Sequence, residues 1–197
     1  LLAKINLVNA SLTKDSIETK RILAHLKSLE NEGYQFENAE HSFDLLIVKL
    51  LGQFKPFFKL DGYSVNITDS GLKDSKLNDN NNAQATVKIT VNGQNETLTA
   101  QGDGPVNALD IALRQALEHF YPQLSDVKLI DYKVRVLDSN QATASKVRVL
   151  IESADKHSSW TTIGVSTDII DASWRAMCDS IEYKLLRDSQ QALALVA

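Results

Sequence analysis

The residue types that most often carry chemistry are few in this chain, and their spacing builds no catalytic constellation. The four histidines are scattered, without the short spacings at which histidine and cysteine ligate zinc; they are His25, His41, His119 and His157. The segment Gly164-Val-Ser-Thr-Asp168 lacks the second glycine of a nucleophile elbow. We therefore expect no catalytic residue, no metal ligand and no cofactor site in this chain.

Two side chains keep a hydrolase hypothesis open. Ser166 or Cys178 would need a neighbouring histidine to act as a nucleophile. Cys178 falls beside an apolar helical face, where cysteine more often behaves as a small buried hydrophobe. Ser166 or Thr167 fits equally well as the cap of a following helix, because its hydroxyl oxygen can accept a backbone hydrogen bond. A stand-alone hydrolase is therefore an alternative and not the leading interpretation.

A glycine-rich turn is a candidate anion site. Gly102 and Gly104 lie between a predicted strand and a predicted helix, and Pro105 suits the first helical turn. The two glycines let backbone N–H groups point at a ligand, and the start of a helix attracts anions. A small carboxylate could dock at this turn. A tight connection with nothing bound explains the same residues equally well.

Composition excludes several classes of protein. The chain has 197 residues, of which 43% are hydrophobic and 23% are charged, as in a globular protein with a sizeable core. A formal charge of −4 gives no reason to expect nucleic acid, and no apolar run reaches the roughly 20 residues of a membrane span. The single cysteine fits a reducing compartment. Because the chain starts at Leu1 without a methionine or leader, we expect a cytoplasmic fragment of a longer polypeptide, with no nucleic acid or membrane partner.

The secondary-structure elements that would position any site form a unit that occurs twice between residues 63 and 183. Each copy has three strand-like runs and then an amphipathic helix, with Tyr63 opening the first copy and Tyr132 the second. The first copy is longer because it carries a polar insertion at residues 73–82, which is expected to be a loop. Within that copy, Asn92-Gly93 predicts a type I′ hairpin turn.

Alternating apolar residues along these strands indicate antiparallel sheets with one covered face. The helix of each unit should cover its own sheet, with apolar faces running from Leu109 to Phe120 and from Ile169 to Leu185. The sequence thus predicts an α+β fold of two tandem βββα units with pseudo-twofold symmetry, preceded by a small helical linker subdomain. The predicted boundaries are 1–58 for the linker, 59–123 and 124–188 for the two units of one domain (59–188), and 189–197 for a tail.

The predicted linker consists of two helices, at about 15–32 and 38–51, each with a single apolar stripe. Gly33 should end the first helix, since glycine accepts the left-handed conformation found there. Two helices with single stripes do not form a stable domain alone. They should pack either on a domain outside this chain or on the βββα body.

Three stretches together carry a family resemblance over nearly the whole chain. They are residues 31–43 (NEGYQFENAEHSF), residues 102–110 (GDGPVNALD), and residues 131–136 (DYKVRV) with 173–177 (SWRAM). In these stretches the chain resembles the C-terminal linker and regulatory region of citramalate synthase. It is similar, less closely, to the same region of 2-isopropylmalate synthase.

The resemblance implies a regulatory role within a larger enzyme. Enzymes of this family condense acetyl-CoA with a 2-oxo acid on a metal-dependent TIM barrel, so the divalent metal and acetyl-CoA would belong to that barrel. The fragment itself is expected to be inactive and to form a homodimer. The resemblance also implies that it binds isoleucine or leucine, the end product of branched-chain amino-acid biosynthesis, and so gives feedback inhibition of its own barrel.

The resemblance places the effector near the first two strands of the second unit. The implied effector-binding residues are Asp131, Tyr132, Asn140, Gln141, Ala142, Thr143, Ala144 and Val147. An acid such as Asp131 could hold the ammonium group, and the small residues at 142–144 leave room for a branched side chain. Tyr132 and Val147 could instead simply fill the core.

Two further functional classes stay open. One is a purely structural dimerisation module that binds no effector. The other is a nucleic-acid-binding βββα module, which the acidic balance and the lack of a Lys/Arg cluster at a helix start disfavour.

Overall fold

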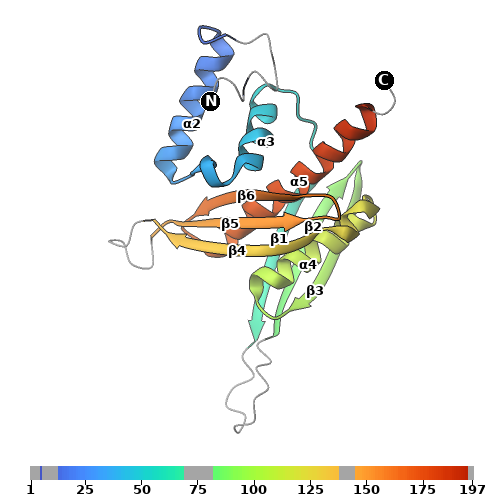
Figure 1. Cartoon of the computed structure of the whole chain (residues 1–197). Helices are drawn as coiled ribbons and strands as arrows, with labels where there is room; N and C mark the ends of the chain where they lie inside the picture. The colour runs from blue at the N-terminus through green and yellow to red at the C-terminus, as the bar shows by residue number, and fades with distance from the viewer. Residues whose placement is uncertain (1–4, 6–12, 69–81, 138–144, 195–197) are drawn as a thin grey trace. The chain divides into compact units, whose positions relative to one another are not determined.

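The computed structural model describes residues 5, 13–68, 82–137 and 145–194, and its elements follow the predicted order (Figure 1). The fold class is confirmed: two antiparallel three-stranded sheets are each followed by a helix, and a helical part precedes them. The pseudo-twofold relation between the units stays a prediction. The elements are α2 (Ile17–Glu32), η1 (Phe36–Asn38), α3 (Glu40–Leu50), β1 (Lys59–Thr68), β2 (Asn82–Val91), β3 (Gln94–Gly102), α4 (Pro105–Glu118), η2 (Pro122–Asp126), β4 (Lys128–Val136), β5 (Val147–Ala154), β6 (Ser159–Ser166) and α5 (Ile169–Ala194).

Two compact units make up the described chain. The residues from Pro56 to Val127 form one, and those up to Lys55 together with those from Lys128 onward form the other. The helical linker therefore belongs with the second βββα motif, one of the two packing partners considered for it. The predicted domain boundaries stay predictions, although α5 continues beyond residue 188 to Ala194.

The unit from Pro56 to Val127 contains the sheet β1-β2-β3 and the helix α4. The predicted hairpin is confirmed, because Asn92 and Gly93 have φ angles of 50° and 82° and join β2 to β3. The apolar face of α4 is also confirmed, with these residues buried: Ala108, Leu109, Ala112, Leu113, Ala116 and Leu117.

The compact unit that includes the linker repeats the same order of elements, with the sheet β4-β5-β6 followed by the helix α5. A register shift between Leu60 and Gly62 in β1 recurs between Leu129 and Asp131 in β4, so the duplication extends to an irregularity of the first strand. The hydroxyl groups of Tyr132 and of Ser173 on α5 share a hydrogen bond of 2.8 Å. The Thr162 hydroxyl donates one of 2.7 Å to the Ala176 carbonyl, also on α5. These bonds identify the face of the sheet that α5 covers.

The predicted covering of the first strands is only partly correct. The central strands β2 and β5 are buried as expected, for example Val87 and Val149 at 0% exposure. The first strands β1 and β4 are less covered: Ile67 in β1 is 63% exposed, and Val134 and Val136 in β4 are 41% and 55% exposed. The helix of each unit packs mainly on the other two strands, so the alternating pattern of an edge strand does not by itself guarantee burial.

The linker helices are bounded close to their predicted ends. α2 stops at Glu32, and Gly33 follows with a φ of 112°, in the left-handed conformation expected of it. Its Ile22 and Leu26 pack with Phe43 and Ile47 of α3 around Ile5. None of the helices in the described part of the chain is both long and apolar enough to cross a membrane.

The other side of α3 covers the free edge of β6. The Thr161 N–H donates to His41 Nδ1 and the Ile163 N–H donates to Ser42 Oγ, both at 3.0 Å. These side chains satisfy edge amides that would otherwise be available for pairing with another strand. α3 is therefore buried on two sides, and the single apolar stripe predicted for it was too simple.

A partly buried charge cluster joins α3 to α5 beside this edge. The Lys49 ammonium lies 3.1 Å from Asp179 Oδ1 and 2.6 Å from Glu182 Oε2. Burial raises the pKa of both carboxyls above their ordinary values, although the charge of Lys49 opposes the shift. The ammonium group of Lys49 thus faces two carboxyl groups, and burial disfavours the charged form of both.

Candidate functional site

The predicted effector residues that the structure describes, Asp131, Tyr132 and Val147, lie on both faces of the second sheet. Tyr132 reaches α5 through the hydrogen bond to Ser173. Asp131 is its neighbour in β4 and therefore points to the opposite face, because side chains alternate along a strand. Its carboxylate forms an ion pair with Lys133. Asp131 and Tyr132 are consequently not brought together on one surface of this chain.

Asp131 is held in its charged form. The hydrogen bond from Lys133 lowers the pKa of the Asp131 carboxyl, and burial opposes this only in part; the backbone N–H of Tyr132, at 2.9 Å, lowers it further. The carboxylate can accept an ammonium group, as predicted. A ligand would have to share it with Lys133 or displace that side chain.

Val147 shares the α5 face with Tyr132 but lies at the other end of it. Val147 pairs with Val136 and Tyr132 pairs with Ile151, so four residues of strand, about 13 Å, separate the two positions. Between them lies Val134, which like Val136 is exposed. The alternating pattern of this strand predicts a covered position for both valines, so this apolar strip at the sheet edge was not expected. Only their exposure in the folded chain reveals it.

The predicted segment Asn140, Gln141, Ala142, Thr143 and Ala144 lies outside the described residues. Directly after it, the Ser145 side chain is buried at 4% exposure, and its hydroxyl has no hydrogen-bond partner within the part of the chain that the structure describes. An unsatisfied buried hydroxyl costs about 1–3 kcal/mol, so such groups often mark a place where a further partner binds. Nothing in the sequence pattern distinguishes this serine from its neighbours.

The candidate anion site at Gly102 and Gly104 has a structural explanation. A Cβ at Gly102 would lie 2.5 Å from the Ala108 nitrogen, so this glycine allows the end of β3 to approach α4. Gly104 is the N-cap of α4, and the Asn107 side chain accepts the Asp103 N–H at 3.1 Å. Anion binding at this turn stays a prediction.

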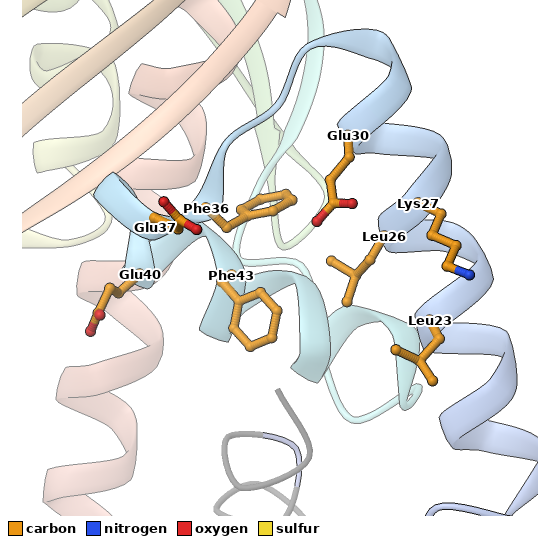
Figure 2. Close-up of a pocket in the computed structure, with 8 residues that line it drawn as sticks. All are labelled: Leu23, Leu26, Lys27, Glu30, Phe36, Glu37, Glu40 and Phe43. Atoms are coloured by element: carbon orange, nitrogen blue, oxygen red, sulfur yellow. The ribbon is translucent and has the colours of Figure 1, made fainter.

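A groove in the linker holds none of the predicted site residues (Figure 2). It has a volume of about 500 Å³ and lies between α2, η1 and the start of α3. Its lining combines four apolar side chains with one ammonium and three carboxylates: Leu23, Leu26, Phe36, Phe43, Lys27, Glu30, Glu37 and Glu40. The apolar stripes predicted for the two linker helices account for Leu23, Leu26 and Phe43 by helix packing alone, so the groove was not expected.

One of the two candidate nucleophiles, Ser166, takes part in the turn that caps α5. Ser166 Oγ accepts the Asp168 N–H at 3.2 Å, and Asp168 Oδ1 accepts the Ile170 N–H at 2.7 Å. Asp168 therefore caps α5, which corrects the assignment of the cap to Ser166 or Thr167. No group of three or more His, Cys, Asp or Glu side chains with metal-site geometry occurs among the described residues.

Cys178 is expected to react slowly in the native protein. Burial raises the pKa of its thiol well above the ordinary value, and the nearby Glu182 and Asp179 add to the shift. Since the thiolate is the reactive form, labelling by a disulfide reagent at pH 8 should be at least about tenfold slower than in urea. Equal rates in the folded and unfolded protein would contradict this prediction.

Comparison of the chain with known proteins identifies its family. Residues 37–185 match the model of the LeuA allosteric (dimerisation) domain. The chain belongs to this LeuA domain family. The match extends from η1 through most of α5, includes both βββα motifs, and leaves α2 outside.

Individual relatives of this LeuA domain are whole enzymes. The chain is 49% identical over 190 residues to an (R)-citramalate synthase from Geobacter sulfurreducens, with 96% of the chain aligned. It is 47% identical over 185 residues to an (R)-citramalate synthase from a Synechocystis strain, with 94% aligned. A 2-isopropylmalate synthase from Aquifex aeolicus is 33% identical over 109 residues, or 55% of the chain.

These matches cover 35%, 34% and 19% of the three enzymes, so the LeuA domain chain spans about a third or less of their length. The predicted resemblance to the regulatory region of citramalate synthase and 2-isopropylmalate synthase is confirmed.

Proposed function

We propose that this chain is the amino-acid-binding regulatory and dimerisation domain of an acetyl-CoA-dependent enzyme that condenses a 2-oxo acid, most closely of the citramalate synthase type. The observation that carries the proposal is the family match over residues 37–185, together with citramalate synthases aligned over almost the whole chain. Condensation, with its divalent metal and acetyl-CoA, belongs in this proposal to a TIM barrel in the rest of a cytoplasmic enzyme. This chain contributes regulation.

Isoleucine or leucine is the proposed effector. The charged carboxylate of Asp131 supplies an acceptor for the ammonium group, and the apolar strip at Val134, Val136 and Val147 supplies surface for a branched side chain. The unsatisfied hydroxyl of Ser145 supplies a further polar contact. Because Asp131 faces away from the strip, one ligand would contact both only if a second protomer completes the site.

The proposed dimer also gives the exposed edge strands a role. β1 and β4 each expose apolar residues at equivalent places, with Ile67 in one and Val136 in the other. Isolated exposed hydrophobic residues are ordinary, but a strip on an unpaired strand edge favours association. A homodimer would cover these edges and would bring residues of two chains together at the effector site.

Feedback inhibition requires that the effector distinguish two states of the enzyme. Binding must be tighter in the state whose barrel is inactive, since a ligand with equal affinity for both states shifts neither. The linker helices α2 and α3 are the proposed connection between the regulatory domain and the barrel.

Titration calorimetry with isoleucine, leucine and valine tests effector binding. We expect isoleucine or leucine to bind, and Asp131→Asn to weaken the affinity about tenfold or more, because a hydrogen bond to a charged group is lost. Glu37→Gln is the matched control, since it removes one carboxylate from the linker groove (Figure 2) and should leave the affinity unchanged.

The outcomes separate the candidate functions. Loss of affinity in Glu37→Gln but not in Asp131→Asn would place the effector in the linker groove. If light scattering shows a dimer and millimolar isoleucine, leucine and valine all give no heat, the proposed sensing role fails and the structural dimerisation module replaces it.

A further inference from the structure

The C-terminal end of α2 contacts the base of the connection between β4 and β5. Gly33 ends α2 with a φ of 112°, and its N–H and that of Tyr34 donate to the Glu30 and Leu29 carbonyls at 3.0 Å. A Cβ at Gly33 would lie 2.2 Å from Leu137 Cδ1. The backbone conformation favours glycine here, and an added Cβ would also have to displace the end of the Leu137 side chain, which comes from more than a hundred residues away.

Arg148 ties the same end of α2 to β5. The Arg148 side chain is buried, and its Nε and Nη1 donate to the Gly33 carbonyl and to Gln35 Oε1, both at 2.6 Å. Both acceptors are neutral oxygens, one of them an orphan carbonyl at the helix end. A buried guanidinium that depends on such acceptors loses much if α2 moves, because its charge would then lack hydrogen bonds.

The base of the β4–β5 connection is itself closed by a backbone hydrogen bond. The Leu137 N–H donates to the Lys146 carbonyl at 2.9 Å. Leu137 packs beside Tyr34 and Phe36 against Ala39, Ile163 and Val165. The Lys146 ammonium also reaches the Glu32 carbonyl at 3.4 Å. Both residues that close the connection therefore contact the linker.

Strand alternation places the proposed effector contact on the reverse side of these residues. Val147 faces α5, whereas Lys146 and Arg148 on either side of it face the linker. A shift or stiffening of this end of β5 on one face is transmitted to the other face, because the strand is a single rigid element.

We propose that the C-terminal end of α2 and the base of the β4–β5 connection form one coupled element, in which Leu137 and Arg148 transmit ligand occupancy beside Val147 to the linker. The ligand part of this proposal rests on the proposed function. The coupling itself depends only on the contacts of Gly33, Leu137 and Arg148.

Amide hydrogen exchange of the chain without ligand tests the coupling. The methyl group added in Gly33→Ala must displace the Leu137 side chain from the end of α2. If the two segments are coupled, we expect exchange at the Leu137 N–H to rise about tenfold or more. Gly52→Ala is the matched control, since Gly52 also has a positive φ of 69° but nothing within 4 Å of an added Cβ. It should leave the Leu137 exchange within about twofold of the original chain.

A second pair of variants tests the coupling in the reverse direction and avoids backbone strain. Arg148→Gln should raise exchange at the Gly33 and Tyr34 amides about tenfold or more, because the end of α2 loses its buried partner. Arg135→Gln is the control, since Arg135 is the exposed cross-strand neighbour of Arg148 on the same face. If both members of each pair behave alike, the coupling is refuted.

Isoleucine and leucine then separate this proposal from the effector role. Transmission is supported if the ligand binds in calorimetry and slows amide exchange at Tyr34 in the original chain. The Arg148→Gln variant should then lose this slowing, while its affinity for the ligand stays within about threefold of the original. Binding without any change at Tyr34 refutes the transmission and leaves the effector role intact. Absence of binding refutes the effector role, and the ligand-free variants then decide the coupling alone.

Discussion

Replacing Lys184 by methionine is expected to lower the free energy of unfolding by about 3 kcal/mol. The Lys184 ammonium lies 2.9 Å from Asp155 Oδ2 and 2.7 Å from Asp188 Oδ2, and the Lys184 and Asp155 side chains are only 7% and 2% exposed. Asp155 would stay buried and would keep its contact with Arg187, but it would lose the other of its two cationic partners. Removing one member of a buried pair is costly because the remaining charge is uncompensated.

Urea unfolding measures this effect, with a lower midpoint and an unchanged slope as the expected result. Lys20→Met, at an exposed position of α2, is the control and should change stability by no more than about 0.5 kcal/mol. Equal midpoints for the two variants would show that the ion pair contributes nothing measurable.

The same cluster predicts a pH dependence. Burial alone would raise the pKa of Asp155, but the hydrogen bonds from Lys184 and from the amides of His157 and Ser158, with the charge of Arg187, hold it well below the ordinary value. Its stabilising contribution is therefore present above pH about 4 and is lost as the pH falls below that value. Lys184→Met should flatten this acid limb of the stability curve.

The acidic side chains beside Lys49 change the stability with pH in the opposite direction. The pKa values of Asp179 and Glu182 are raised, so their contribution is larger when they are protonated and falls as the pH rises above about 4. Asp179→Asn should remove part of this loss, and this variant distinguishes the two clusters in a pH titration of stability.

Gly164→Ala should destabilise the second unit by about 3 kcal/mol. An added Cβ at Gly164 would lie 1.9 Å from the Ala172 carbonyl oxygen and 3.0 Å from the Ala176 nitrogen, both in the backbone of α5. Backbone atoms of a packed helix cannot rotate aside, so α5 would have to move away from β6. That movement would also strain the hydrogen bond from Thr162 to the Ala176 carbonyl.

Tryptophan fluorescence during urea unfolding follows this change, because Trp160 and Trp174 are buried in this unit. Gly62→Ala is the control, since an added Cβ there would have nothing within 4 Å and no positive φ is involved. A Gly164→Ala variant as stable as Gly62→Ala would mean that β6 and α5 are packed less closely than the structure shows.

The candidate site was less predictable than the fold. Alternation along β4, which the sequence already shows, places Asp131 and Tyr132 on opposite faces, so the predicted pairing of these two residues at one site conflicted with the predicted strand. Only the folded chain shows that the Tyr132 face is the one covered by α5. The buried hydroxyl of Ser145 and the groove of the linker have no local sequence signal, because both arise from what surrounds them.

The sequence by itself determined the duplicated βββα order, the Asn92-Gly93 turn and the end of α2 at Gly33, since each depends on residues close together in the chain. The tertiary structure alone decided that the linker packs on the second motif, that β1 and β4 keep exposed edges, and that Arg148 binds the end of α2. The linker packing and the Arg148 contact join residues more than a hundred positions apart, and the exposure of an edge strand depends on where the helices of the folded chain pack. Periodicity and turn chemistry act over a few residues, whereas burial and hydrogen bonding between distant segments are set only when the whole chain is folded.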